Sequence, residues 1–415
     1  MIKIKKNIVD IKTSATLAIN ELSQQLEKNG KEIFKFGLGE SPFPIPNVIV
    51  KELKKNAQQK NYINVSGLIQ LRNQVAKYHS IKNKNNYTAE NVIIGPGSKE
   101  LIFQTQLVLD CVVLLPSPSW VSYEPQAQIL SKKIHWIKTD AKSNWHITPE
   151  EFDKVCQNLN QVEKLLILNS PNNPSGTSHN NLEALATIAK KNNIIVLSDE
   201  IYAELDFSGN YKSISHYYPE GTIISSGLSK WCGAGGWRIG SITFPQELNY
   251  IRKIVRNIAS ETYTSVSAPI QYAAIKAYTE DHTQYLINSR KILENIANYI
   301  YKELTDVGIK CQKTQGGFYM LCDFSNVIKL SNEISDGQSL CQKILSQVGF
   351  AMLPGSVFGI QNELLISRIA FVDFDGRKAL DLMQNNNRIP EDFLQKACPK
   401  IVKGIKKLKE WVKKN

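Results

Sequence analysis

The sequence predicts an α/β fold in which a large domain with a mostly parallel sheet, flanked by helices, is followed by a smaller α+β domain. Between about residues 91 and 245, short β-branched runs alternate with helical stretches and turn clusters, which is typical of a parallel sheet covered by helices. From residue 282 a long helical pattern begins, and short strands and further helices follow it. A chain of 415 residues is long enough for two or three domains.

The elements are expected in the following order. The first forty residues are rich in helix formers but too few to form a domain, so we expect them to pack on the C-terminal part. The strands expected in the large domain are Asn91–Ile94, Cys111–Leu115, Leu165–Leu168, Ile194–Leu197, Thr222–Ser225 and Ile239–Phe244. The small domain is expected to hold a helix over 282–306 and strands at Phe318–Phe324 and Leu364–Phe371. The resulting boundaries are an N-terminal segment at 1–40, a large domain at 41–281 and a small domain at 282–415.

The net charge of 50 − 38 = +12 raises the question of nucleic acid or a membrane surface as a partner. However, residues 396–415 hold eight Lys and one Glu, so this tail carries +7 of the total. Four apolar residues recur there at helical spacing: Ile401, Ile405, Leu408 and Val412. We therefore expect a terminal helix docked by that stripe with its lysines in solvent, and neither a nucleic-acid nor a membrane partner.

The cysteines and histidines predict neither disulfides nor a metal site. The seven Cys are odd in number and contain no C-x-x-C pair, which favours reduced thiols in a cytoplasm. The six His form no H-x-x-x-H or H-E-x-x-H pattern. The N-terminus has no compact apolar region followed by a small-residue cleavage site, and no run of 18 apolar residues occurs.

Four segments combine a strand end with residues that carry chemistry. NVIIGPGSKELIF (91–103) indicates a strand, a Gly-rich turn and a helix from near Lys99 that Ser98 can cap; such a helix start can bind phosphate, although an ordinary helix cap explains it equally well. The third Gly of the dinucleotide fingerprint is replaced by Glu100. LILNSPNNPSGT (166–177) places a turn of Asn, Pro and Gly after a buried strand.

The other two segments place charged residues at strand ends. In VLSDEIYAEL (196–205), Asp199 ends an apolar strand, where it can pair with a ligand cation or cap the following helix. In SSGLSKWCGAGGWRIG (225–240), Lys230 stands among small residues eight positions before Arg238. A lysine beside a phosphate-binding arginine suits imine chemistry with a carbonyl cofactor, while an ordinary surface lysine is the alternative.

In this order and spacing, the four segments closely resemble the class I/II aminotransferases, which are fold-type I enzymes that use pyridoxal 5′-phosphate (PLP). The resemblance runs from about Ser14 to Asp375, and its strongest parts are SPNNPSGT, SDEIY and SK…GGWRIG, with 31 residues between Asp199 and Lys230. It implies an enzyme that moves an amino group from an L-amino acid to a 2-oxo acid by a ping-pong mechanism. It also implies an active homodimer with shared sites.

The resemblance assigns a role to each matching residue. Lys230 would form the Schiff base with PLP and shuttle the proton, and Asp199 would keep the pyridine nitrogen protonated. The remaining cofactor contacts would come from Gly97, Ser98, Lys99, Trp120, Asn173, Tyr202, Ser229, Arg238 and, across the dimer, Tyr62. The substrate α-carboxylate would be bound by Arg368 and by the backbone of Gly39, next to Trp120 and Asn173. Where the family often has Ser or Thr as a phosphate ligand, three residues before the lysine, this chain has Gly227; Ser226 and Ser229 are the alternatives.

The substrate class rests on two further features. SATLAIN (14–20) followed by GLGES resembles the bacterial branch with aspartate and aspartate/prephenate aminotransferases. In that branch a lysine directly after the phosphate-loop glycines contacts the side-chain carboxylate of dicarboxylic substrates, and Lys99 occupies this position. Aspartate and glutamate are therefore the expected donors, although a solvent-facing lysine remains the alternative for Lys99. An aromatic or broad-specificity aminotransferase, a PLP-dependent C–S β-lyase and a non-catalytic regulator on the same fold are the other readings of the chain.

Overall fold

The computed structural model of the chain describes residues 2–159, 161–384 and 389–415. Its helices are α1 Ala15–Lys28, α2 Asn47–Asn56, α3 Ile69–Asn83, α4 Ser98–Val108, α5 Tyr123–Ile129, α6 Pro149–Asn158, α7 Leu182–Lys191, α8 Asn249–Glu261, α9 Ala268–Thr279, α10 Thr283–Thr305, α11 Gly337–Val348, α12 Gly376–Gln384, α13 Phe393–Ala397 and α14 Pro399–Lys414. Its strands are β1 Phe34–Lys35, β2 Val92–Gly95, β3 Val112–Ser117, β4 Ile134–Lys138, β5 Lys164–Asn169, β6 Ile195–Asp199, β7 Thr222–Gly227, β8 Gly240–Thr243, β9 Lys310–Cys311, β10 Tyr319–Asp323, β11 Phe350–Ala351, β12 Leu353–Pro354 and β13 Ile366–Ala370.

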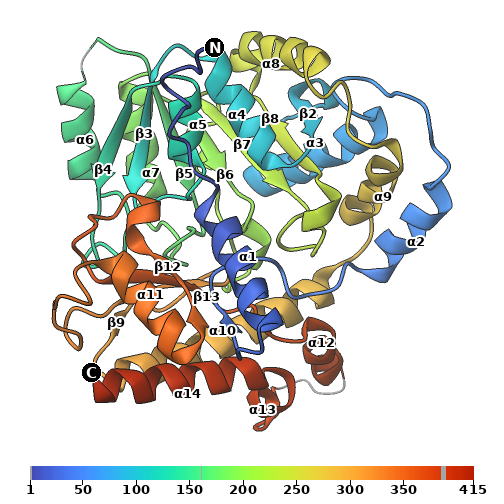
Figure 1. Cartoon of the computed structure of the whole chain (residues 1–415). Coiled ribbons are helices and arrows are strands. Elements are labelled where there is room, and N and C mark those ends of the chain that lie inside the picture. The colour runs from blue at the N-terminus through green and yellow to red at the C-terminus, as the bar shows by residue number, and fades with distance from the viewer. Residues whose placement is uncertain (1, 160, 385–388) are drawn as a thin grey trace.

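The centre of the molecule is a seven-stranded sheet in the order β2-β8-β7-β6-β5-β3-β4 (Figure 1). Every neighbouring pair from β7 to β4 is parallel, and β8 alone runs against both of its neighbours. Helices cover both faces: α4, α5 and α8 pack on one, and α6 and α7 on the other. This arrangement explains why β5 is buried at every residue, since a central parallel strand has no solvent side. The predicted α/β fold is confirmed.

A second, antiparallel sheet lies below the first in Figure 1, in the order β12-β13-β10-β9, and α10, α11 and α14 pack around it. β1 pairs in parallel with β11, so the segment after α1 joins this part of the molecule. Residues near the N-terminus instead contact a helix of the first sheet: the Asn7 side chain donates to the carbonyl oxygen of Ile129, the last residue of α5, at 2.8 Å. The predicted domain boundary at 281/282 falls between α9 and α10, and the division into domains stays a prediction.

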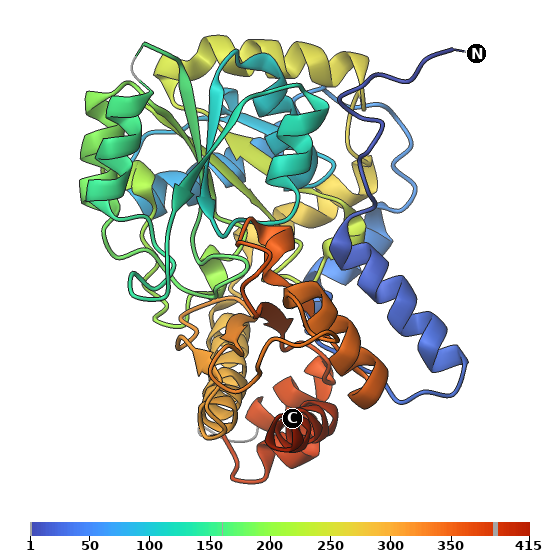
Figure 2. The ribbon, with the colours of Figure 1, turned by 60° about the vertical axis from the view of Figure 1, so that its left-hand side comes forward.

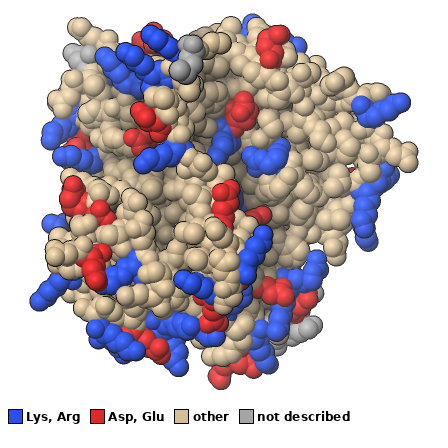
Figure 3. Space-filling view, viewed as in Figure 1, with Lys and Arg blue, Asp and Glu red and all other residues tan. Residues whose placement is uncertain are grey.

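The basic tail forms α14, and the predicted apolar stripe faces the core: Ile401, Ile405, Leu408 and Val412 are all buried. Several of its lysines are paired, because Lys403 and Lys407 contact Glu32 at 2.5 and 2.9 Å. Figure 3 shows blue Lys and Arg side chains along the lower edge of the molecule, interspersed with red acidic ones. The expectation of a docked helix is therefore confirmed. Within the described ranges, no helix combines the length and apolar character needed to cross a bilayer.

Two parts of the sequence prediction need correction. The sequence does not predict β4, because its residues IHWIK mix polar and aromatic side chains and Ile137 alone of them is fully buried. Ser98 does not cap α4: Gly97 occupies the cap position with φ +91°, and Ser98 is the first helical residue. A glycine is required there because its left-handed backbone conformation is one that L side chains rarely adopt.

Candidate active site

The predicted site residues gather at the carboxyl ends of three neighbouring parallel strands. β5 ends at Asn169 and β6 at Asp199, and the two residues are aligned in the register of the sheet. Asp199 is aligned in turn with Ser225 of β7. Ligands of open α/β sheets bind at this edge. The loops that follow carry Asn173, Tyr202 and Lys230, so the fold brings together residues that are 57 positions apart in the chain (230 − 173).

Asp199 lies at the bottom of the site and is fully enclosed. Its Oδ2 accepts a hydrogen bond from the Tyr123 hydroxyl at 2.7 Å, and its Oδ1 accepts one from the backbone N–H of Ile201 at 3.3 Å. Burial raises the pKa of Asp199 to about 6, while these two hydrogen bonds and the charge of Lys230 oppose the rise. No described cation forms an ion pair with Asp199. A buried, unpaired carboxylate lowers the stability of the folded chain unless a positively charged ligand group approaches it.

Lys230 follows β7, the strand that pairs with the one ending at Asp199, and is only partly buried. Its Nζ donates to the carbonyl oxygen of Gly39 at 2.7 Å. It also lies 5.9 Å from the centre of the Tyr202 ring and 5.7 Å from that of Phe318. Apolar ring faces on two sides and a single carbonyl partner leave the amine accessible to a reacting carbonyl group.

Gly97 and Arg238 form a positively charged cradle at the start of α4. The Arg238 guanidinium donates to the carbonyl oxygens of Gly235 at 3.0 Å and Pro96 at 3.4 Å. A Cβ atom at Gly97 would lie 2.3 Å from Arg238 Nη2, so only glycine permits this approach. The cradle therefore combines the free N–H groups of a helix N-terminus with an exposed guanidinium, which is the arrangement that binds phosphate.

Lys99 and Trp120 lie beside the cradle. The Lys99 ammonium is 5.1 Å from the centre of the Trp120 ring, within cation–π range. Desolvation lowers the pKa of Lys99, and the charges of Arg238 and Lys230 lower it further. Trp120 also packs edge-on against Tyr123, with ring centroids 5.3 Å apart. Trp120 is thus part of the wall that leads from the cradle to Asp199.

Arg368 on β13 reaches the site from the second sheet and is completely buried. Its Nη1 donates to Oδ1 of Asn173 at 3.1 Å, and its Nη2 donates to the carbonyl oxygen of Gly37. The guanidinium lies 4.6 Å from the centre of the Tyr319 ring and 5.0 Å from that of Phe358. Its Nε is buried with no hydrogen-bond partner, and no described carboxylate pairs with it. Burial lowers the pKa of Arg368, and a planar anion is the partner that this cation lacks.

Sequence reasoning missed three residues of this constellation. Tyr123 binds Asp199, Gly37 binds Arg368, and the Tyr319 hydroxyl lies 2.8 Å from that of Tyr202. Tyr319 also explains Gly39, because a Cβ at Gly39 would lie 2.0 Å from the Tyr319 hydroxyl oxygen. Tyr123 has a weak sequence signal, since it follows Trp120 by three positions in the segment after the strand predicted at Cys111–Leu115. Tyr319 has none, because an aromatic residue in a strand is ordinarily core.

Three predicted residues stand apart from these contacts. Tyr62 is 90% exposed in the loop between α2 and α3, so a single chain does not enclose it. Ser226 and Ser229 are partly buried near the end of β7. At Gly227 a Cβ would lie 3.0 Å from the carbonyl oxygen of Ile239. The strand pair Gly227–Gly240 is therefore tightly packed, and a larger residue would have to displace it.

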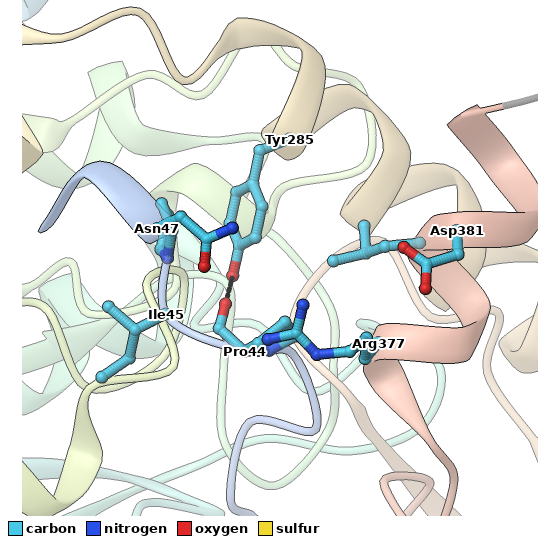
Figure 4. Close-up of a pocket in the computed structure, with 8 residues that line it drawn as sticks. Pro44, Ile45, Asn47, Tyr285, Arg377 and Asp381 are labelled. Carbon is cyan, nitrogen blue, oxygen red and sulfur yellow. Dashed lines mark hydrogen bonds between the residues drawn. The ribbon is translucent and has the colours of Figure 1, made fainter. Parts of the chain in front are cut away.

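A small pocket lies at the edge of this region and holds none of the predicted residues (Figure 4). Its cavity is about 130 Å³, between the start of α2 and helices α10 and α12. There the Tyr285 hydroxyl donates to the carbonyl oxygen of Pro44 at 3.1 Å. A Cβ at Gly376 would lie 2.1 Å from the carbonyl oxygen of Pro42. These contacts fasten the segment that follows Gly39 to the helices of the second half.

The arrangement fits PLP at each of its polar groups. The cradle offers N–H groups and a guanidinium for the phosphate, Asp199 offers a carboxylate for the ring nitrogen, and Lys230 offers an amine for the aldehyde. A fold with this sheet and this site defines a PLP-dependent transaminase of fold-type I.

Comparison with known proteins identifies the family. The chain belongs to the family aminotransferase class I and II, which matches residues 31–373. The aspartate aminotransferase of Bacillus sp. (strain YM-2) is 30% identical over 85% of this chain and 91% of its own length. The aspartate/prephenate aminotransferase of Thermus thermophilus is 27% identical over 91% and 97%. A solved structure of Thermus thermophilus aspartate aminotransferase with maleate superimposes with a TM-score of 0.83 at 26% identity, covering 93% of this chain and all of that one.

Proposed function

We propose that this aminotransferase uses aspartate and glutamate as amino donors and a 2-oxo acid as acceptor, in ping-pong order. The observation that carries an amino acid substrate is Arg368, a fully buried guanidinium that no described carboxylate pairs with. A guanidinium takes a carboxylate through two parallel hydrogen bonds. Asn173 and the Tyr319 ring hold its plane fixed, so a bound α-carboxylate would have one orientation toward Lys230.

The residues around the substrate would act as follows. When bound, PLP withdraws electrons from the substrate Cα and so makes its proton removable. Lys230 Nζ takes that proton and returns it on the same face, since the rings of Tyr202 and Phe318 limit where the amine can move. Asp199, held by Tyr123, would stay ionised opposite the ring nitrogen. Gly97, Ser98 and Arg238 would hold the phosphate, and Ser229, in the loop after β7, would be a further ligand once the phosphate is bound.

Lys99 supports the choice of dicarboxylic substrates. It is a cation with a lowered pKa whose neighbours include two further cations, Arg238 and Lys230. A second carboxylate on the substrate would relieve this repulsion, whereas an alkyl side chain would not. The relatives named above point in the same direction, because their names specify aspartate, and the Thermus structure was solved with the dicarboxylate maleate.

The test compares kcat/KM for L-aspartate and L-alanine in Lys99→Ala, with Lys54→Ala on α2 as an exposed control. We expect Lys99→Ala to lower kcat/KM for aspartate by about 10- to 100-fold and to leave alanine within a factor of about 3, because one charge-assisted hydrogen bond contributes ~1.5–3 kcal/mol. An equal loss on both substrates would contradict the dicarboxylate assignment. A preference for L-phenylalanine would make the protein an aromatic aminotransferase. Release of pyruvate and ammonia without an acceptor would make it a β-lyase.

We also propose that the active unit is a homodimer in the cytoplasm. Tyr62 supports the dimer, because an aromatic side chain that is 90% exposed is available to a second copy. The seven cysteines support a reducing compartment, since all of them are unpaired thiols. Sedimentation of the purified protein tests the first proposal: a monomer with full activity would exclude a shared site. Fractionation of the source cells tests the second.

A further inference from the structure

A basic pocket lies away from the candidate active site, between α3, α8 and the loop before α3. Its cavity is about 320 Å³. It is lined by Asn64, Ser66, Arg72, Glu90, Arg252, Lys253, Arg256 and Asn257. None of the residues proposed to contact PLP or substrate lines it. The pocket is therefore a separate feature of the molecule.

Two arginines are built into the wall of this pocket. Arg72 is 6% exposed, and Arg252 is 7% exposed. Arg72 is fixed by donating Nε to the Gly67 carbonyl oxygen at 3.2 Å and Nη1 to that of Ala89 at 2.8 Å. Arg252 is fixed by donating Nε to Oδ1 of Asn249 at 2.7 Å. No hydrogen bond to another described residue uses Nη2 of Arg72 or either Nη of Arg252, so these donors are left for a ligand in the cavity.

The charge of the pocket is strongly unbalanced. Four cations line it (Arg72, Arg252, Lys253 and Arg256) against the single carboxylate of Glu90, which gives 4 − 1 = +3. Glu90 is mostly exposed, and within the described part of the chain its carboxylate forms an ion pair with Arg72 alone, at 3.3 Å. Arg252 and Arg256 are four residues apart on α8 and so lie on one face, where like charges repel. Burial lowers the pKa of Arg252, and the charges of Arg72 and Arg256 lower it further, while the charge of Glu90 opposes this shift.

We propose that this pocket binds a phosphate-type dianion, either inorganic phosphate or the phosphate group of a small metabolite. The physical reason is that planar guanidinium groups approach from two elements, and a tetrahedral oxyanion can accept from both at once. A dianion also removes the repulsion among the three arginines without an induced rearrangement, because two of them are already held in place. The cavity of about 320 Å³ leaves room for an organic group attached to the phosphate.

An anion bound there would contact three segments of the chain at once. Asn64 and Ser66 come from the loop that carries Tyr62, Arg72 comes from α3, and the remaining cations come from α8. Ser66 also accepts a hydrogen bond, through its carbonyl oxygen, from the backbone N–H of Ile94 at 2.9 Å. An anion in the pocket would therefore stabilise the loop between α2 and α3 against the first strand of the large sheet.

The experiment is calorimetric titration of phosphate into the PLP-saturated protein, with sodium chloride keeping the ionic strength constant. Saturation with PLP removes the cradle at Gly97 as a competing site. Arg252→Gln and the more exposed Arg256→Gln should each weaken phosphate binding by about tenfold or more, because each removes charge-assisted hydrogen bonds. Lys154→Gln on α6 is the matched control and should bind as the unmodified protein does. Circular dichroism verifies that each variant is folded.

The outcomes separate the sources of the phosphate and test the proposal itself. A phosphomonoester such as phenyl phosphate that binds more tightly than inorganic phosphate would support a metabolite, and equal binding would support the free ion. No saturable heat at millimolar phosphate, or equal binding in Arg256→Gln and Lys154→Gln, would overturn the proposal. If Arg256→Gln instead converted a dimer to a monomer while phosphate failed to bind the dimer, the pocket would be filled by a second copy of the chain, and the proposal would be wrong. None of these readouts depends on transaminase activity.

Discussion

The two ends of the candidate active site differ in how they are held. At the inner end, Asp199 is enclosed and is fixed by Tyr123 and the backbone of Ile201. At the outer end, Arg238 is exposed and is held only by two backbone carbonyl oxygens. The inner end is therefore preorganised at the expense of a buried charge, while the outer end is open to solvent. We therefore expect the inner end to govern reactivity and the outer end to govern retention of the cofactor.

Asp199→Asn should break the inner end and have the largest effect. We expect kcat to fall by about 10²–10³-fold, because a fixed charge aimed at the reacting system contributes on that scale. Activity of the PLP-saturated variant against that of the unmodified protein measures it. Tyr123→Phe keeps the carboxylate but removes its 2.7 Å hydrogen bond, and should give a smaller loss. An Asp199→Asn enzyme with near-normal kcat would refute the division of roles.

The same substitution should change stability in the opposite direction. The pKa of Asp199 is about 6 in the folded chain and about 4 when unfolded, so the folded state binds more protons between these values. The stability of the cofactor-free protein should therefore decrease as pH rises from 4 to 6, by at most ~3 kcal/mol from this group. Cofactor-free Asp199→Asn should accordingly melt higher than the unmodified protein at pH 8, and this difference should shrink at pH 5.

At the outer end, Arg238→Gln should weaken PLP binding by about 10- to 100-fold, since it removes charge-assisted hydrogen bonds to a phosphate. At saturating PLP, however, kcat should stay within a few-fold of normal. Gly97→Ala should act in the same way, because its Cβ would lie 2.3 Å from Arg238 Nη2. Equilibrium dialysis with PLP gives the affinity. Variants that lose kcat but keep their PLP affinity would reverse the roles of the two ends.

A pair of buried histidines should affect stability alone, with no change in kcat or PLP affinity, and its pH dependence is opposite to that of Asp199. The rings of His146 and His179 lie 4.6 Å apart, and burial lowers their pKa values to about 4 and about 3. The unfolded chain then binds more protons below pH 6.5, so these groups make the protein less stable as pH falls from 6.5 toward 4. Between pH 7 and pH 5, His146→Gln should reduce this acid sensitivity by ~2 kcal/mol, from ~1.36 kcal/mol per pKa unit over the interval from 6.5 to 5. Denaturant unfolding at pH 7 and pH 5 tests it, with exposed His216→Gln as control. An unchanged pH slope would contradict the buried, neutral pair.

The sequence predicted the strands that end at the site better than the edges of the two sheets. β5 and β6 contain consecutive apolar residues on both faces, and β7 contains Ile223 and Ile224, so their composition identifies them. β1, β9, β11 and β12 have two residues each, which is too short for any periodicity to appear. Motif order placed Asp199 and Lys230 at neighbouring strand ends. It could not reveal Tyr123 or Tyr319, because their roles arise from side-chain packing between segments far apart in the chain.

The central claim is that Lys230 binds PLP and that dicarboxylic amino acids donate the amino group that the enzyme transfers. An absorption spectrum tests it most directly, recorded for the purified protein with PLP and again after addition of L-aspartate and then L-phenylalanine. The account predicts the absorbance band of lysine-bound PLP, its conversion to the pyridoxamine form by aspartate, and loss of the bound band in Lys230→Ala. The absence of any cofactor band in the unmodified protein, or conversion by phenylalanine but not by aspartate, would contradict it.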